Sequence, residues 1–136
     1  MIKSKVLFLC TGNSCRTQMA EALLRHLAGD RFDIISAGAD PYPLDLEAVE
    51  AMRELGIDIS SQTPKNVSRF LGQRFTYVIS LCDREKERTC PIFPGAIWRQ
   101  QWDFENPALA SDHSKAVRCV RDQLRQRIIQ FVSENQ

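Results

Sequence analysis

The sequence predicts an α/β fold, in which a single domain over residues 1–136 holds a four-stranded parallel sheet with helices on both faces. Three observations support this class. Apolar runs of strand length alternate with stretches of helical periodicity, as expected for strands joined by helical crossovers. The chain length of 136 residues is that of one ordinary domain. No internal repeat, low-complexity segment or linker divides the chain.

The expected elements follow in order along the chain. Residues 5–10 (KVLFLC) form a nearly continuous apolar run, which is typical of a strand buried on both faces. From Cys15 the apolar residues take helical spacing, and Gly29 is a good helix stop. The other strands are expected at residues 32–37, 75–81 and 96–102, and the other helices at residues 44–55 and about 112–131.

Parallel sheets bind their ligands at the carboxyl ends of the strands. Cys10, Cys82 and the loop after Trp102 all follow strand ends in this arrangement. We therefore expect these three segments to meet at one edge of the sheet and to form the functional site.

Composition limits the classes of function. Lys and Arg total 18 against 17 Asp and Glu, a net charge of +1, which excludes a protein held mainly by nucleic-acid phosphates. The apolar runs are too short to span a membrane, and the first one is expected to be a strand and not a signal peptide. Five unevenly spaced cysteines favour a reducing cytoplasm over a secreted disulfide framework. His26 and His113 lie far from any cysteine pair, so we expect no zinc site and no cofactor.

Residues 10–17 (CTGNSCRT) join the first expected strand to the first helix. The loop amides and the helix start can form a nest for a tetrahedral oxyanion. Gly12 supplies backbone freedom, and Asn13 tolerates left-handed geometry. Arg16 can bind the oxyanion with two donors and favours a Cys10 thiolate. With Cys10 as the nucleophile, the expected oxyanion-binding residues are Thr11, Gly12, Asn13, Ser14, Cys15, Arg16 and Thr17.

A cysteine followed six residues later by an arginine occurs three times in the chain, so context must decide between the matches. The match at Cys119 lies inside an amphipathic helix, whose amides are already bonded. The match at Cys82 lacks glycine and contains acidic residues that repel oxyanions. Only Cys10 has strand, glycine and helix in order, and its alternative is a buried strand-end thiol. Cys15 is expected to face the helix interior.

Cys82 and Cys90 lie at the two ends of a polar segment that should open at low cost. Together with Cys10 they make a relay possible. Cys10 would attack the oxyanion centre, Cys82 would attack the Cys10 sulfur, and Cys90 would attack Cys82 and leave a disulfide near the surface. Without Cys10, the pair would be better explained as incidental cysteines in a solvated loop.

Five segments resemble the thioredoxin-coupled arsenate reductases, which share the low-molecular-weight tyrosine phosphatase fold: CTGNSCRTQMAEALL, ISAG, AVEAMRELGIDISSQT, VISLC and WDFENPA. The resemblance implies that arsenate, or another tetrahedral oxyanion, is bound and that arsenite is released. It implies that thioredoxin reduces a Cys82–Cys90 disulfide, while glutaredoxin stays open as the reductant. In some relatives, side chains matching Asn13, Glu21 and Ser36 help to hold a potassium ion behind the loop.

The chain departs from this family at two positions. Asn106 stands where the family usually has the aspartate that protonates an ester leaving group. Hydrolysis of phosphate esters should therefore be poor, whereas arsenate reduction should tolerate an asparagine at this position better. Lys65 stands where potassium-binding relatives carry an aspartate. Its ammonium is expected to replace the cation and to tie Asn13 to Glu21. A solvated helix position is the alternative for Glu21, and a simple strand end is the alternative for Ser36.

Two other functions stay open. A protein tyrosine phosphatase would be expected to carry the late Asp-Pro pair, where this chain has Asn106 and Pro107. A non-catalytic oxyanion or arsenite binder, or a redox sensor that uses Cys82 and Cys90, would bind without turnover. Tyr42 is undecided as a cleft residue, and Trp102 is expected in the core.

Overall fold

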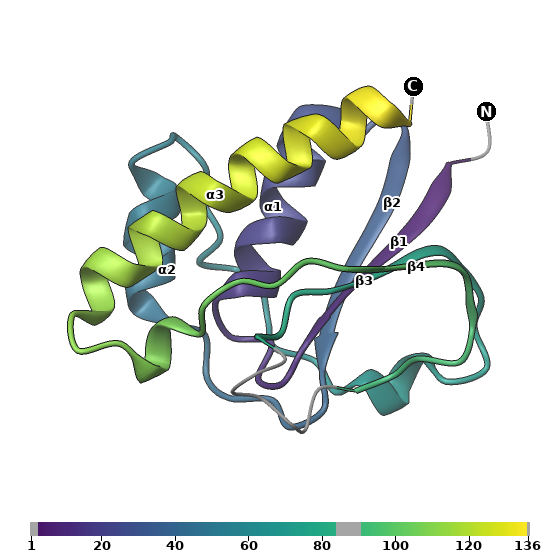
Figure 1. Cartoon of the computed structure of the whole chain (residues 1–136), viewed down its shortest axis with the longest axis horizontal. Helices are drawn as coiled ribbons and strands as arrows, with labels where there is room; N and C mark the ends of the chain where they lie inside the picture. Colours follow the sequence, from purple (N-terminus) through teal and green to yellow (C-terminus); the bar gives the residue numbers. More distant parts are fainter. Residues whose placement is uncertain (1–2, 84–90, 136) are drawn as a thin grey trace.

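The computed structural model describes residues 3–83 and 91–135. Its elements are β1 (Ser4–Cys10), α1 (Arg16–Ala28), β2 (Phe32–Gly38), α2 (Leu46–Arg53), the 3₁₀ helix η1 (Val67–Phe70), β3 (Phe75–Ser80), β4 (Ala96–Gln101), the 3₁₀ helix η2 (Pro107–Leu109) and α3 (His113–Glu134). Within these residues the strands form one parallel sheet in the order β2-β1-β3-β4 (Figure 1). The expected fold class is confirmed.

Capping residues set the starts of two helices. α2 begins at Leu46, later than the apolar pattern indicates. Asp45 caps it there, because its side chain accepts a hydrogen bond from the Glu47 amide at 2.9 Å. Asp112 caps α3 in the same way, with the Lys115 amide donating at 3.1 Å. Among the described residues, no helix has the length and apolar character needed to cross a bilayer.

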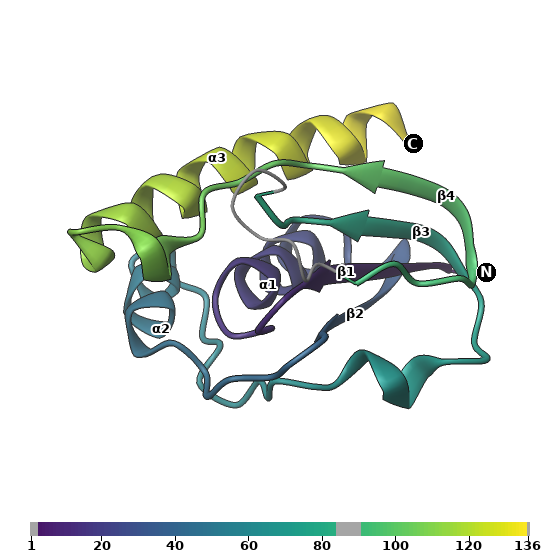
Figure 2. The same cartoon turned by 60° about the horizontal axis from the view of Figure 1, so that its bottom comes forward.

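The two faces of the sheet are covered unequally (Figure 2). α1, α2 and α3 all contribute to one large core cluster on one face, where Trp102 packs against Phe8, as expected for a core tryptophan. The opposite face holds a smaller cluster that includes Leu7 and Phe75. Among the described residues, η1 and irregular segments cover this second face. The three α-helices, expected on both faces, therefore all lie on one.

The carboxyl ends of the strands converge as predicted. The Leu81 amide donates to the Leu9 carbonyl at 2.8 Å, one residue before Cys82 and Cys10 respectively. The Trp102 amide donates to the last carbonyl of β3 at 2.8 Å. This edge therefore joins the first loop, the segment that begins at Cys82 and the loop after β4.

Candidate active site

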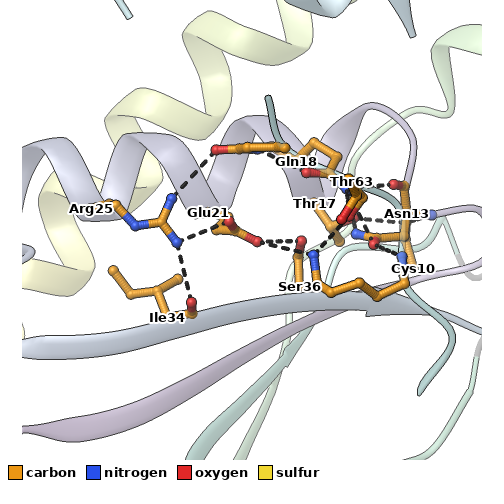
Figure 3. Close-up of polar contacts among 11 residues, drawn as sticks. Cys10, Asn13, Thr17, Gln18, Glu21, Arg25, Ile34, Ser36 and Thr63 are labelled. Atoms are coloured by element: carbon orange, nitrogen blue, oxygen red, sulfur yellow. Dashed lines mark hydrogen bonds and ion pairs between the residues drawn. The ribbon is translucent and has the colours of Figure 1, made fainter. Parts of the chain in front are cut away.

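Cys10 is the last residue of β1 and is 2% exposed. The Asn13 amide donates to its sulfur at 3.1 Å, and Thr17 Oγ1 lies 3.2 Å from the same atom. Asn13 Nδ2 donates to Thr17 Oγ1 at 2.7 Å, which leaves the hydroxyl proton of Thr17 for the sulfur (Figure 3). The Asn13 amide and the Thr17 hydroxyl can therefore both donate to the Cys10 sulfur.

The loop between β1 and α1 keeps its amides available to a ligand. Within the described residues, no hydrogen bond runs from the amides of Thr11, Gly12, Ser14 or Cys15 to another protein group. The buried Thr11 hydroxyl also lacks a partner there. Asn13 has the expected left-handed backbone, with φ of 50°. Free amides at the start of a helix are suited to binding a tetrahedral oxyanion.

Two glycines allow neighbouring chain to approach this loop closely. A Cβ atom on Gly38 would lie 2.6 Å from the Thr11 carbonyl oxygen and 2.9 Å from the Asn13 amide nitrogen. A Cβ atom on Gly12 would lie 2.6 Å from the ring of Tyr42, whose amide donates to the Gly12 carbonyl. The half-exposed ring of Tyr42 therefore lies against the oxyanion loop.

Arg16 connects the loop to the other two segments of the site. The residue is 4% exposed, and its Nη1 donates to the Leu81 carbonyl at 3.1 Å and to the Phe104 carbonyl at 3.2 Å. Leu81 directly precedes Cys82. The arginine expected to bind the oxyanion is thus fixed by carbonyls next to the second thiol and in the late loop.

The cysteines differ in chemical state. Cys82 is buried and disulfide-bonded, and Cys90 lies outside the described residues. Cys15 faces the protein interior as expected, and burial, with the Asp45 carboxylate adding to it, raises the pKa of its thiol. Cys119 is a free thiol on the exposed side of α3. Of the free thiols at the site, Cys10 is therefore the one with donors to its sulfur, while Cys15 stays protonated.

Glu21 lies behind the loop and is 6% exposed, so the alternative of a solvated helix position is wrong. Ser36 Oγ donates to Glu21 Oε1 at 2.6 Å, and Arg25 pairs with Oε2 at 2.9 Å (Figure 3). Lys65 Nζ lies 3.8 Å from Oε1. Burial lowers the pKa of Lys65, although Glu21 opposes this shift. The Glu21 carboxylate thus contacts two cationic side chains and a hydroxyl.

Asn13 is held from behind by backbone and side-chain donors. Its Oδ1 accepts from the Lys65 backbone amide at 2.8 Å and from Gln18 Nε2 at 3.2 Å. Gln18 also donates to the Thr63 carbonyl at 3.1 Å (Figure 3). The expectation that the Lys65 ammonium contacts both Asn13 and Glu21 is therefore wrong for Asn13. The Gly38 amide donates to the Lys65 carbonyl and holds the backbone, not the ammonium, against Asn13.

Sequence reasoning missed Asp45 and His113. The Asp45 amide donates to the Ser14 carbonyl at 2.9 Å, and its carboxylate lies 2.7 Å from His113 Nε2. An aspartate before a helix is a capping signal, but nothing in the sequence connects it to a histidine so far along the chain.

The family model described as low molecular weight phosphotyrosine protein phosphatase matches residues 5–136. The chain belongs to this family. Within it, the chain is 42% identical over 135 residues to the arsenate reductase of Halalkalibacterium halodurans, with 96% of each chain covered. It is 38% identical over 128 residues to the arsenate reductase of Oceanobacillus iheyensis, covering 94% of this chain and 91% of the relative. The resemblance indicated by the sequence motifs is confirmed.

Solved structures of the phosphatase family agree with this placement. An arsenate reductase in a phosphate-binding state has a TM-score of 0.82 and 31% identity, with 98% of each chain covered. A thioredoxin-dependent arsenate reductase of Corynebacterium glutamicum has a TM-score of 0.72 and 27% identity, and the match covers 98% of this chain and 64% of that one. A tyrosine phosphatase of Erwinia amylovora, at 18% identity and a TM-score of 0.77, shares the fold.

The potassium ion held by some members of the phosphatase family does not fit the residues of this chain. The Glu21 carboxylate already faces Arg25 and Lys65, and Asn13 Oδ1 already accepts two hydrogen bonds. Among the described residues, no group of three or more His, Cys, Asp or Glu side chains could hold a metal ion. Lys65 supplies a positive charge within the protein itself.

Asn106 caps η2. Its Oδ1 accepts from the Ala108 amide at 3.1 Å. Phe104, two residues earlier, contributes a carbonyl to Arg16, so this segment borders the oxyanion loop. A side-chain amide has no acidic proton to give to a leaving group.

Proposed function

We propose that this protein reduces arsenate to arsenite, with Cys10 as the nucleophile. The observation that carries the proposal is the hydrogen-bonded Cys10 sulfur at the base of a loop in which four amides have no partner among the described residues. Arg16, fixed between the segments that contain Leu81 and Phe104, would complete the oxyanion site. Within residues 11–17, the amides of residues 11, 12, 14 and 15 and the Arg16 guanidinium would bind arsenate, while the Asn13 amide and the Thr17 hydroxyl hold the Cys10 sulfur.

The reduction would proceed by thiol exchange. The Cys10 thiolate forms a bond to arsenic, and an arsenic hydroxyl takes up a proton from solvent and leaves as water. The Cys82 thiolate then attacks the Cys10 sulfur, and the electron pair of the sulfur–arsenic bond leaves with arsenic as arsenite. Cys90 attacks Cys82, which releases the Cys10 thiolate and leaves a Cys82–Cys90 disulfide. The disulfide state of Cys82 and its position beside the Arg16 contact are in accord with this sequence.

The final disulfide would be reduced by the dithiol of thioredoxin, which becomes oxidised in exchange. A glutaredoxin system is the alternative reductant. Either would place the reaction in a reducing cytoplasm, with no nucleic acid or membrane partner. Glu21, Ser36 and Lys65 would support the loop from behind, with the Lys65 backbone amide holding Asn13.

The test is arsenate-dependent NADPH oxidation with thioredoxin and thioredoxin reductase. C10S, C82S and C90S should each lower turnover by about 100-fold or more, because each removes one thiolate of the relay. C119S is the matched control, since Cys119 is exposed on α3, and it should stay within about twofold of the native rate. Arsenate or phosphate binding without turnover, with a glutaredoxin system also tried, would contradict the proposal and favour the binder or sensor.

A further inference from the structure

His113 contacts two hydrogen-bond acceptors at once. At the start of α3, its Nδ1 lies 2.9 Å from the Pro107 carbonyl oxygen, and its Nε2 lies 2.7 Å from Asp45 Oδ2. A neutral imidazole has one N–H and one lone pair, so it can donate to only one of these oxygens. Only the imidazolium form donates to both.

These two contacts join segments on either side of the site. The Asp45 amide donates to the Ser14 carbonyl of the oxyanion loop at 2.9 Å. Pro107 directly follows Asn106 in the late loop. His113 and Asp45 therefore form a continuous path of hydrogen bonds from Ser14 to the residue next to Asn106. Arg16 and Phe104 make the second connection between these loops.

The charges around His113 favour its protonated form. The hydrogen bond to Pro107 is the largest cause that raises the pKa of His113, and the Asp45 carboxylate adds to it, while partial burial opposes both. From α2, Glu47 also faces the imidazole and contributes in the same direction. Arg118, on the same helix as His113, pairs with Glu47 and reduces its effect.

We propose that protonated His113 is a positioning residue for arsenate reduction, which clamps the Asn106 segment to the oxyanion loop through Asp45. The catalytic part of this inference rests on the proposed function, but the clamp itself does not. When His113 loses its proton, one ring nitrogen must present a lone pair to an oxygen acceptor. That contact is then lost, and the connection through Arg16 and Phe104 is left to hold the two loops together.

The direction of the pH dependence follows from the raised pKa. The clamp is complete below about pH 6.5, the ordinary value for histidine, and opens as the pH rises through the higher value in the folded protein. The site should therefore lose order on the alkaline side and keep it on the acid side.

The experiment is an NMR titration of the histidine side chains. The chain has two histidines, so H113Q leaves a single set of imidazole signals and assigns the other. In the native protein, the His113 midpoint should lie above 6.5, and the backbone amides of Ser14 and Ala108 should shift with the same midpoint. D45N keeps a good helix cap but removes the carboxylate, so it should lower the His113 midpoint. H26Q, at an exposed position of α1, is the matched control and should leave that midpoint unchanged.

Turnover supplies the second measurement. The native kcat/KM should fall at alkaline pH with the His113 midpoint, and H113Q should remove that dependence and lower the value at pH 6 by about 3- to 10-fold. A His113 midpoint at or below 6.5, or one that D45N does not change, would overturn the clamp. Amide shifts that follow His113 while kcat/KM does not would overturn its role in catalysis. Absence of arsenate turnover with the titration intact would refute the proposed function and leave the clamp standing.

Discussion

Asn106 keeps the backbone geometry of the late loop while it lacks an acidic proton. Its side-chain oxygen caps η2 by accepting from the Ala108 amide, a role that aspartate performs equally well. An aspartate in place of Asn106 would therefore change the chemistry of the site more than its structure.

Asn106→Asp should raise the rate at which the protein hydrolyses phosphate esters. Hydrolysis of p-nitrophenyl phosphate near pH 5.5 should rise by about tenfold or more, because a carboxyl group can protonate the leaving phenolate. The free energy of unfolding, measured in urea, should stay within about 0.5 kcal/mol of the native value. Asn106→Ser caps the turn without an acid and is the control. An unchanged hydrolysis rate in N106D would show that the missing acid is not what limits the reaction.

Lys65 gives the site its own cation, so we expect no requirement for potassium. Replacing potassium chloride by choline chloride should leave the native kcat/KM for arsenate within about twofold. Lys65→Asp would place a second carboxylate beside Glu21, and the pair should then gain stability from an added cation. Its thermal midpoint should rise with potassium, while that of the native protein should not. A native enzyme that needs potassium would contradict this.

At the scale of the elements, the end of β2 forms the floor of the oxyanion loop. A Cβ at Gly38 would collide with the backbone of Thr11 and Asn13, and neither can move without disturbing the loop. Gly38→Ala should destabilise the protein by about 1–3 kcal/mol and weaken phosphate binding in titration calorimetry.

Gly56→Ala is the matched control for Gly38→Ala. Gly56 has φ of 77° and open space around it, so alanine strains the backbone by about 1 kcal/mol without touching the loop. Phosphate affinity should fall in G38A and not in G56A. Equal affinities in the two variants would show that the approach of β2 does not shape the loop.

Much of this element-level organisation could be predicted from the sequence. Parallel strands place Cys10 and Cys82 at one edge whatever the detailed packing, and Asn13 is a residue type that accepts the backbone of the loop. The pairing of His113 with Asp45 could not be predicted, because it depends on how α3 packs beside the start of α2. The atom of Lys65 that contacts Asn13 could not be predicted for a related reason, since it is set by the backbone pairing of Lys65 with Gly38.

At the scale of the whole molecule, an aromatic cluster runs from Trp102 at the carboxyl edge of the sheet to the amino end. Phe131 of α3 packs against Phe32, Tyr77 and Trp102. Phe32 is the first residue of β2, so this aromatic cluster extends to the amino end of the sheet, away from the oxyanion loop.

Phe131→Ala should lower the free energy of unfolding by about 3–5 kcal/mol, because Phe131 is fully buried. Ile129→Ala, at a partly exposed position on the same helix, should cost about 1 kcal/mol or less. Urea denaturation measures both. The KM for arsenate should stay within about twofold in F131A well below its melting temperature, and a large rise would show that the aromatic cluster shapes the site.

The unequal cover of the sheet has a consequence for how the protein withstands proteases and changes in length. The face under α1, α2 and α3 is sealed by a deep apolar layer, whereas η1 and irregular chain close the other face with few buried side chains. Local opening should therefore begin on the thin side. Among the described residues, limited proteolysis should cut first around residues 71–74. Inserted residues should be accepted there, because this segment is exposed and does not include the Lys65 backbone that holds Asn13.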